Sequence, residues 1–325
     1  MESSRRRFLQ IAGAAAATPV LARNAPALDY PARSLRWIVG FPPGGGTDIV
    51  ARIMAQWLSE RLGQSVVVDN RPGASTNISI QAAVAAPPDG YTLVCVTAST
   101  ALNVSLYENL PFNLLRDIAP VAGLIDFSLV MVVSPKLPVR SVPEFIAYAK
   151  ANPGRISMAS YGTGSTSHLA GELFKVMTGV QMVHVPYRGE GLALSDMMGS
   201  QVQVMFATLT GALPLIRSGA LRLLAVCAKT RSEFVPEAPT VAESVPGYEA
   251  NSWAGVGVPR GTPPEIVARL NAEVNAGLAD RATRARLAAA GTTPIVYTPD
   301  GFGAYMAQEI DKWGKVIRAS GVKLE

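Results

Sequence analysis

The pattern of hydrophobic and polar positions predicts alternating strands and helices over most of the chain. Short apolar runs rich in β-branched residues indicate buried strands, and apolar residues three or four positions apart indicate amphipathic helices. The expected strands are 37–39, 65–69, 91–97, 121–133 (two runs separated by Asp126), 156–160, 183–186, 202–207, 221–228, 253–258 and 293–297. The expected helices are 48–62, 77–86, 98–106 (helix or loop), 141–151, 168–178, 189–198, 211–218, 263–278, 281–289 and 300–319. This alternation predicts an α/β fold with mostly parallel sheets flanked by helices.

The first of two glycine-rich turns joins the predicted strand 37–39 to the next helix. Its paired prolines cannot continue a strand ladder, and they stiffen the loop. Amides at such a helix start favour anion binding, although a glycine turn needed only for packing remains the alternative. The turn matches neither a phosphate-binding Gly-Lys-Ser/Thr loop nor the dinucleotide G-x-G-x-x-G pattern. Thr47 is the expected N-cap, Asp48 suits the positive helix end, and the candidate residues are Phe41, Pro42, Pro43, Gly44, Gly45, Gly46, Thr47 and Asp48.

A second turn repeats this arrangement with more hydroxyl groups. One side-chain oxygen is enough to cap a helix, so the surplus favours a ligand site over ordinary capping. In open α/β sheets, ligands bind beyond the carboxyl ends of strands, where two such turns can face each other. Two helix starts facing one cleft predict a ligand with two acidic ends, held without Lys or Arg. The candidate residues are Gly162, Thr163, Gly164, Ser165, Thr166 and Ser167, followed by His168.

The first residues have the pattern of an export signal. Residues 4–10 contain a twin arginine followed by Phe-Leu, and a weakly apolar stretch and small-residue cleavage sites come next. A twin-arginine signal is expected for residues 1–27, and a Sec signal is the alternative; both predict a periplasmic protein. Residues 1–27 carry four arginines and one glutamate, so they account for +3 of the net charge of +5 and leave +2.

Composition excludes several classes of protein. Cys95 and Cys227 lie in apolar strand runs, which predicts buried thiols, although an exported protein could pair them. Two histidines without a Cys/Asp cluster give no zinc signature, so neither a metal nor a cofactor is expected. Basic residues form no stripe interleaved with aromatic residues, so nucleic acid is not an expected partner. Beyond the signal, no apolar run reaches the ~18 residues of a membrane span.

Several motifs together resemble one family of receptors. They are F-P-P-G-G-G-T-D-I-V-A-R at 41–52, N-R-P-G-A at 70–74, P-D-G-Y-T-L at 88–93, Y-G-T-G-S-T-S-H-L-A-G-E-L-F at 161–174, V-H-V-P-Y-R-G at 183–189 and A-P-T-V-A-E at 238–243. From about Tyr30 to the C-terminus the chain resembles Bug-family periplasmic solute-binding proteins of tripartite tricarboxylate transporters. The resemblance implies a type II clamshell, a Venus flytrap, with residues 28–133 plus 250–325 in one domain and 134–249 in the other. The crossovers are expected near 132–138 and 248–252.

The resemblance also implies how a ligand is held. One carboxylate is expected at the start of the helix after 162–167, and the other near 42–46, often through water. The polar segment 97–103 is expected to line the cleft through Thr97, Ser99 and Asn103; Tyr187 and Asn77 are weaker candidates. One position departs from the family pattern, because Ala207 stands where members commonly have an aspartate. Without that carboxylate, an amino-acid ligand is less expected than a bulkier apolar or aromatic acid.

The expected function is capture of a small organic carboxylate, a di- or tricarboxylate or an aromatic acid. The partners implied are the membrane subunits of a tripartite tricarboxylate transporter, and the receptor is expected to be a monomer. A periplasmic sensor that reports to a signalling system is an alternative. A hydrolase using Ser165 or Ser167 with His168 is disfavoured, because no G-x-S-x-G elbow is present. We therefore do not expect an enzyme.

Overall fold

Strands with helices on both sides make up the computed structural model, which describes residues 30–320. The predicted signal peptide lies outside these residues. The strands are β1 Leu35–Val39, β2 Val66–Asn70, β3 Thr92–Thr97, β4 Ile118–Val133, β5 Ser157–Ser160, β6 Val183–Pro186, β7 Val204–Thr208, β8 Arg222–Val226, β9 Asn251–Pro259 and β10 Thr292–Pro294. The helices are α2 Gly46–Leu62, α3 Asn77–Val84, α4 Ala98–Leu106, α5 Leu114–Asp117, α6 Val142–Ala151, α7 Thr166–Thr178, α8 Glu190–Met198, α9 Leu209–Arg217, α10 Pro264–Ala279, α11 Arg281–Ala289 and α12 Pro299–Ser320.

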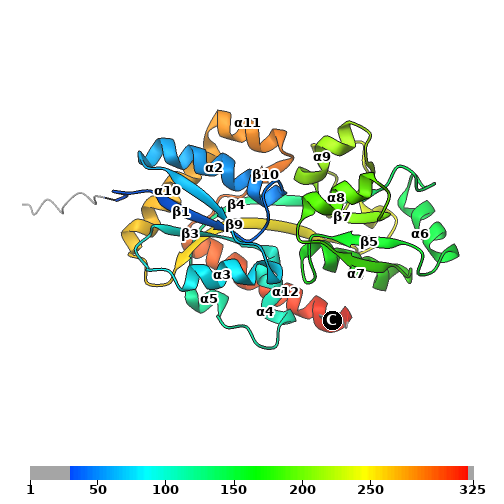
Figure 1. The fold of residues 1–325 in the computed structure, drawn as a ribbon, viewed down its shortest axis with the longest axis horizontal. Coiled ribbons are helices and arrows are strands. Elements are labelled where there is room, and N and C mark those ends of the chain that lie inside the picture. Colours follow the sequence, from blue (N-terminus) through cyan, green and yellow to red (C-terminus); the bar gives the residue numbers. More distant parts are fainter. Residues whose placement is uncertain (1–29, 321–325) are drawn as a thin grey trace, which may run out of the picture.

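The strand order confirms the α/β class and corrects the expected strand directions. The path runs β2-β1-β3-β9-β4-β7-β5-β6, and β8 and β10 also pair with β4. Parallel pairs join β1 to β2 and β3, and β5 to β6 and β7. The pairs made by β9 and β4 are antiparallel, so the prediction of mostly parallel sheets is wrong at the centre of the path. Figure 1 shows β4 and β9 running in opposite directions along the long axis.

The strand β4 joins two sheet regions without a break. It pairs with β9 as far as Ser128 and with β7 from Leu129 onward. We call β1, β2, β3, β9, β10 and residues 118–128 the first sheet region, and residues 129–133 with β5 to β8 the second. The sheet partners of β4 therefore change at 128/129, before the crossover expected near 132–138, and the expected two runs form one strand. Asp126 does not interrupt it because its backbone stays in register with Trp253.

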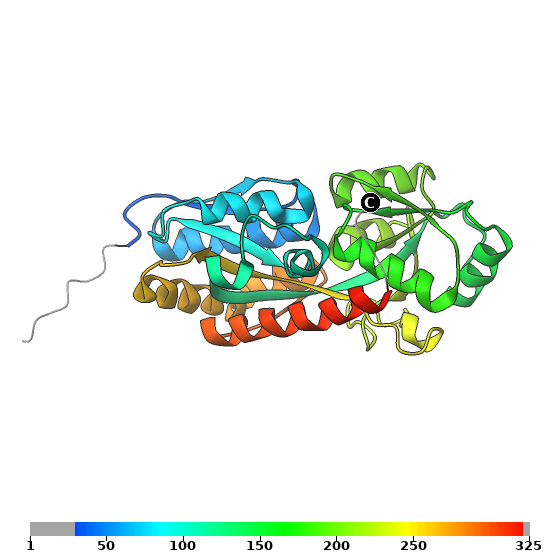
Figure 2. The same ribbon diagram turned by 90° about the horizontal axis from the view of Figure 1, so that it is seen from below.

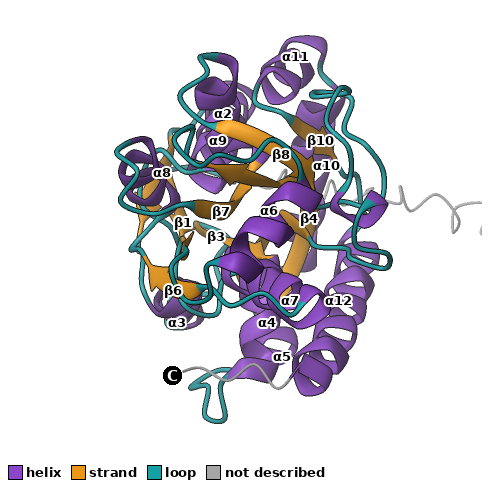
Figure 3. Ribbon diagram, turned by 90° about the vertical axis from the view of Figure 1, so that its right-hand side faces the viewer, coloured by secondary structure: helices purple, strands orange, loops and turns teal. Residues whose placement is uncertain are grey.

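Helices cover the strands of both regions. Figure 3, which views the molecule from the end of the second region, shows α6, α7, α8 and α9 around the strands. Figure 2 shows α12 running along the first region toward the second. Phe302 and Met306 of α12 pack in a core with β3, whereas Trp313 and Ile317 pack in a core with residues 129–133 and α7. The helix therefore connects the hydrophobic cores of both regions.

Two predicted boundaries differ from the structure. Helix α2 begins at Gly46 with Gly45 as its N-cap, not Thr47, because the Asp48 carboxylate reaches back and accepts from the Gly44 amide at 2.9 Å. The last strand covers Thr292–Pro294 rather than 293–297, because the Tyr297 carbonyl accepts hydrogen bonds from Asn271 and Asn275 instead of a strand partner.

The cysteine prediction is confirmed. Cys95 and Cys227 are buried and unpaired, and burial raises the pKa of each thiol to about 12. Within residues 30–320, no helix is long and apolar enough to cross a bilayer. The same residues contain no group of His, Cys, Asp and Glu that could hold a metal ion.

One carboxylate on β4 is expected to cost stability at neutral pH. Burial and the nearby carboxylates of Glu309 and Glu249 raise the pKa of Asp126 to about 6, although Lys312 opposes them. The folded chain therefore holds this proton more tightly than the unfolded chain, so the penalty is present above pH 6 and absent below pH 4. We expect Asp126→Asn to raise the free energy of unfolding by about 2 kcal/mol at pH 7.5. Urea unfolding of the native protein and the variant at pH 7.5 and pH 4 checks this. An equal gain in the free energy of unfolding at pH 4 would contradict it.

Candidate ligand-binding site

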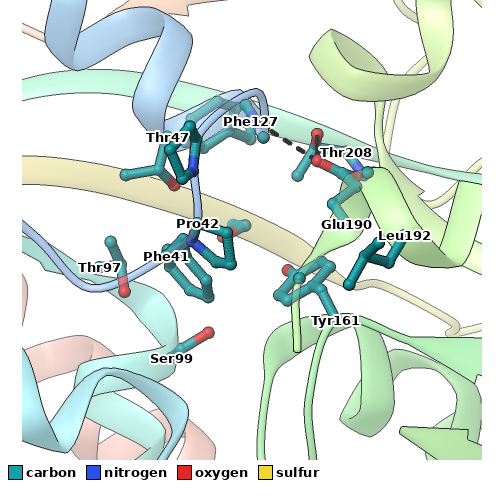
Figure 4. Close-up of a pocket in the computed structure, with 16 residues that line it drawn as sticks. Phe41, Pro42, Thr47, Thr97, Ser99, Phe127, Tyr161, Glu190, Leu192 and Thr208 are labelled. Atoms are coloured by element: carbon teal, nitrogen blue, oxygen red, sulfur yellow. Dashed lines mark hydrogen bonds between the residues drawn. The ribbon is translucent and has the colours of Figure 1, made fainter. Parts of the chain in front are cut away.

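A cavity of about 370 Å³ lies between the two sheet regions. Its volume suits a small organic molecule, and its lining is mainly apolar with a few polar groups. Figure 4 shows Phe41, Pro42 and Thr47 on one side and Tyr161, Glu190, Leu192 and Thr208 on the other. The predicted site residues that line it are Phe41, Pro42, Pro43, Gly45, Gly46, Thr47, Thr97 and Ser99. The lining residues that were not predicted are Phe127, Tyr161, Gly189, Glu190, Gly191, Leu192, Thr208 and Ser252.

The turn between β1 and α2 forms the first wall. Asp48 lies behind this turn rather than in the cavity, and holds it through hydrogen bonds from Arg52 (2.9 Å), Gly44 (2.9 Å) and Asn70 (2.8 Å). Burial opposes ionisation of Asp48, but these hydrogen bonds prevail and lower its pKa. Asp48 is therefore a charged group that fixes the loop. Gly44 contributes to this through the hydrogen bond from its amide to Asp48.

The amide of Gly46, the first residue of α2, already has an acceptor from the other wall. It donates to Glu190 Oε2 at 3.3 Å across the cavity. Glu190 begins α8, is 6% exposed, and also accepts from the Thr208 amide at 2.6 Å and the Thr208 hydroxyl at 2.8 Å. Burial raises the pKa of Glu190, and these hydrogen bonds oppose the rise. The predicted anion position at the start of α2 is thus occupied by a carboxylate of the protein itself.

Sequence reasoning missed Glu190, although a signal was present. Gly189-Glu190-Gly191 follows β6 and opens α8, which repeats the strand, glycine and helix-start order of the two turns that were selected. An acidic residue at the positive end of a helix has an ordinary stabilising role, so the pattern alone does not mark a cavity residue. Ala207, by contrast, is fully buried in β7 and lies in the core behind the cavity.

The hydroxyl-rich end of the cavity lies where the starts of α4 and α7 meet. Thr97 is the N-cap of α4, and the Ser99 hydroxyl accepts from the Thr166 amide of α7 at 3.3 Å. The Thr166 hydroxyl bonds to Tyr161 and donates to Ser252 Oγ at 3.4 Å. Three of these hydroxyls, those of Thr97, Ser99 and Ser252, belong to residues that line the cavity. The two predicted segments, 97–103 and 162–167, are therefore brought together here.

The rest of the second turn lies behind Tyr161. Ser165 is the N-cap of α7, and its Oγ accepts from the His168 amide at 3.3 Å. The Ser167 amide bonds to the Tyr161 hydroxyl. No residue of this turn lines the cavity, whereas Tyr161 does. The Ser167 hydroxyl has no hydrogen-bond partner within the described part of the chain.

The remaining predicted residues lie nearby but outside this cavity. Gly162, Thr163 and Tyr187 line a neighbouring hollow of about 750 Å³ that shares Phe41, Pro42 and Tyr161 with it. Asn103 is buried, and its side chain donates to the Ser75 carbonyl at 2.6 Å and to Asn77 at 2.8 Å. These two asparagines therefore support the fold beside the cavity.

His168 has a structural environment. Its Nδ1 accepts from the Gly164 amide at 3.2 Å, and its ring stacks on His184 with centroids 3.9 Å apart. Burial lowers the pKa of His168 to about 4. The Ser165 hydroxyl donates to the Gly162 carbonyl at 2.6 Å and not to a histidine, so the residues suggested for a hydrolase do not form a nucleophile–base pair.

The cavity has an uneven charge distribution. Its lining contains one carboxylate, that of Glu190, and no Lys, Arg or His. Its polar capacity otherwise comes from hydroxyl groups and from the amides at the starts of α2 and α4. Among the residues described, the Ser99 and Thr47 amides have no hydrogen-bond acceptor. Such neutral donors can hold an anion without a basic side chain.

Comparisons with known proteins agree with this architecture. Residues 50–322 match the model of the tripartite tricarboxylate transporter family receptor. The chain is 40% identical over 322 residues to Protein BugT of Bordetella pertussis, which covers 98% of this chain and 99% of the relative. It is 36% identical over 316 residues to a protein in the tcbD-tcbE intergenic region of a Pseudomonas species, with coverage of 96% and 94%.

Solved structures give the same result. R. palustris Rpa4515 with adipate superposes with a TM-score of 0.89 at 38% identity, covering 91% of this chain and 99% of that chain. MatC from Rhodopseudomonas palustris with bound malate has a TM-score of 0.84 at 30% identity, covering 89% and 100%. The chain therefore belongs to the Bug family of tripartite tricarboxylate transporter receptors, and it is a binding receptor rather than an enzyme.

Proposed function

We propose that this chain is a periplasmic receptor that captures a small organic acid and delivers it to the membrane subunits of a tripartite tricarboxylate transporter. The observation that carries the proposal is the cavity between the two sheet regions, with hydroxyls and helix starts at one end. Family membership supports the transporter partner, and relatives solved with adipate and malate support an acidic ligand. Residues 1–27 would direct export, and the receptor would act as a monomer.

The two sheet regions are proposed to be the lobes of a clamshell. This division is supported by the change of partners along β4 at 128/129, close to the proposed boundary at 133/134, and by the start of β9 at Asn251, close to the proposed return at 250. Hydrogen bonds already cross between the regions, from the Thr166 amide to Ser99 and from the Gly46 amide to Glu190. A ligand that contacts both lobes favours the closed arrangement through its higher affinity for it.

The ligand carboxylate is proposed to lie at the hydroxyl-rich end. The Thr97, Ser99 and Ser252 hydroxyls can donate to it, and the Ser99 amide adds a donor at the start of α4. The Ser99 hydroxyl oxygen accepts from the Thr166 amide, which leaves its hydrogen free to donate to this carboxylate. Phe41, Phe127 and Leu192 line the cavity and suit an apolar chain between the ends of the ligand.

A calorimetric screen of organic acids, followed by Ser99→Ala, tests this function. We expect at least one small acid to bind the native protein with micromolar or lower Kd, and to raise its Tm. Ser99→Ala should weaken that acid about tenfold, because hydrogen bonds to a charged group contribute about 1.5–3 kcal/mol.

The matched control is Ser218→Ala, since Ser218 is exposed and its hydroxyl donates to the Leu215 carbonyl away from the cavity. Affinity should be unchanged in this variant. Absence of binding across mono-, di- and tricarboxylates, aromatic acids and amino acids would contradict the proposed function.

A further inference from the structure

The carboxylate of Glu190 is built into the cavity. Three helix starts surround it: its own in α8, that of α2 through the Gly46 amide, and that of α9 through Thr208, the N-cap residue. The fit is close, because a Cβ at Gly211 would lie 2.5 Å from Glu190 Oε2. The Thr208 hydroxyl accepts from the Gly211 amide at 3.1 Å and donates to Glu190 at 2.8 Å, so its orientation is fixed.

Burial raises the pKa of Glu190, but its hydrogen bonds favour the ionised form. Oε1 accepts from the Thr208 amide, and Oε2 accepts from the Gly46 amide and the Thr208 hydroxyl. Both oxygens therefore act as acceptors toward backbone amides, and a proton on either one would face a donor. Neutral dipoles supply the stabilisation, since no Lys, Arg or His lines the cavity.

This anion restricts what the facing end of a ligand can be. A second carboxylate placed beside Glu190 would meet a like charge in a partly dehydrated cavity without a basic side chain, which is strongly unfavourable. The α2 amide that could have bound such a carboxylate already donates to Glu190. A carboxylate offers about four acceptor positions, and three are used here, so a ligand hydroxyl or ammonium group can donate to the fourth.

We propose that Glu190 determines the ligand class, and that the receptor selects acids with one carboxylate and a hydrogen-bond donor at the other end over dicarboxylates. This inference rests on the proposed function and sharpens it. Under this inference the expectation based on Ala207 is reversed, because the cavity lining does contain an acidic group. The carboxylate of Glu190, which belongs to α8, lies at the end of β7 and accepts a hydrogen bond from the Thr208 amide. Hydroxy acids and amino acids are therefore the favoured ligands.

Acids of matched length test the inference on the native protein. The six-carbon series is adipate, 6-hydroxyhexanoate, 6-aminohexanoate and hexanoate, and the four-carbon series is succinate, 4-hydroxybutyrate, 4-aminobutyrate and butyrate. In the series that binds, calorimetry should show at least a tenfold lower Kd for a donor-ended acid than for the dicarboxylate. Equal or tighter binding of the dicarboxylate would overturn the inference while leaving the proposed function intact; no binding by any acid would instead remove the proposed function.

Two substitutions at position 190 assign the preference to its carboxylate. Glu190→Gln keeps the shape, removes the charge and frees the Gly46 amide, and Glu190→Ala frees the same donor by truncation. Both should reduce the preference for the donor-ended acid over the dicarboxylate at least tenfold. Glu233→Gln makes the same charge change at an exposed residue outside the cavity lining and should leave the preference unchanged. An unaltered preference in folded Glu190→Gln and Glu190→Ala, measured by the same titrations, would overturn the role of Glu190.

Discussion

An alanine at position 46 is expected to keep the two lobes from closing and to weaken acid binding about tenfold to a hundredfold. A Cβ there would lie 2.8 Å from Thr208 Oγ1, 3.3 Å from Thr210 Cβ and 3.2 Å from Phe127 Cε1. Thr208 and Thr210 belong to the opposite wall, so the added methyl group acts directly on the contact between lobes. Overpacking of this kind costs about 1–3 kcal/mol, which corresponds to the stated loss in affinity. Calorimetry gives the affinity, and small-angle scattering gives the radius of gyration, which should increase.

The neighbouring glycine supplies the control for Gly46→Ala. Gly45 has φ of −82°, and the nearest atoms to an added Cβ are 3.9 Å away, so alanine fits there without a clash. Gly45→Ala should keep native compactness, with a small loss of stability because alanine is a poorer N-cap than glycine. If Gly46→Ala bound acid as tightly as Gly45→Ala and remained as compact, the close approach at Gly46 would not control closure.

Replacing Trp313 with alanine is expected to lower the free energy of unfolding by about 3–5 kcal/mol. Trp313 is 2% exposed and packs in the core of the second region, although α12 begins against the first. Its Nε1 donates to Glu309 Oε2 at 3.2 Å, the same oxygen that accepts from Trp253 Nε1 at 3.1 Å. The alanine variant therefore loses a large buried ring and the hydrogen bond from Trp313 to Glu309. Urea denaturation at pH 7.5 measures the resulting loss in the free energy of unfolding.

Trp313→Phe separates packing from hydrogen bonding. The smaller ring keeps most of the contact area but cannot donate to Glu309, so a loss of about 1 kcal/mol is expected from the hydrogen bond, with a modest packing loss added. A phenylalanine variant as unstable as the alanine variant would show that the hydrogen bond, and not the buried ring, dominates at this position.

Local patterns predicted the helices and strands well, because each has its own periodicity and end signals. The predicted helices 141–151 and 168–178, for example, lie close to the observed α6 and α7. Pairing between distant strands was harder. Nothing in 121–133 shows that one strand serves two sheet regions, because a buried strand has the same apolar composition whichever partner it has.

The candidate site was predicted in outline, and its chemistry was not. The first turn and Thr97 and Ser99 do line the cavity, since strand ends followed by helix starts meet at one place in this fold. Gly45 and Gly46 could not be told apart, because the difference depends on Thr208, which is 162 residues after Gly46 in the sequence. Glu190 was missed for the same reason: its role depends on an amide donor 144 residues away.

The continuous strand β4 also bears on how the protein unfolds. Residues 118–128 take their hydrogen bonds from β9, and residues 129–133 take theirs from β7 and β8. Melting either region would leave part of this strand without partners and would expose apolar surface where the other region begins. We therefore expect the two sheet regions to unfold as a single cooperative unit, in which a half-unfolded intermediate has little stability of its own.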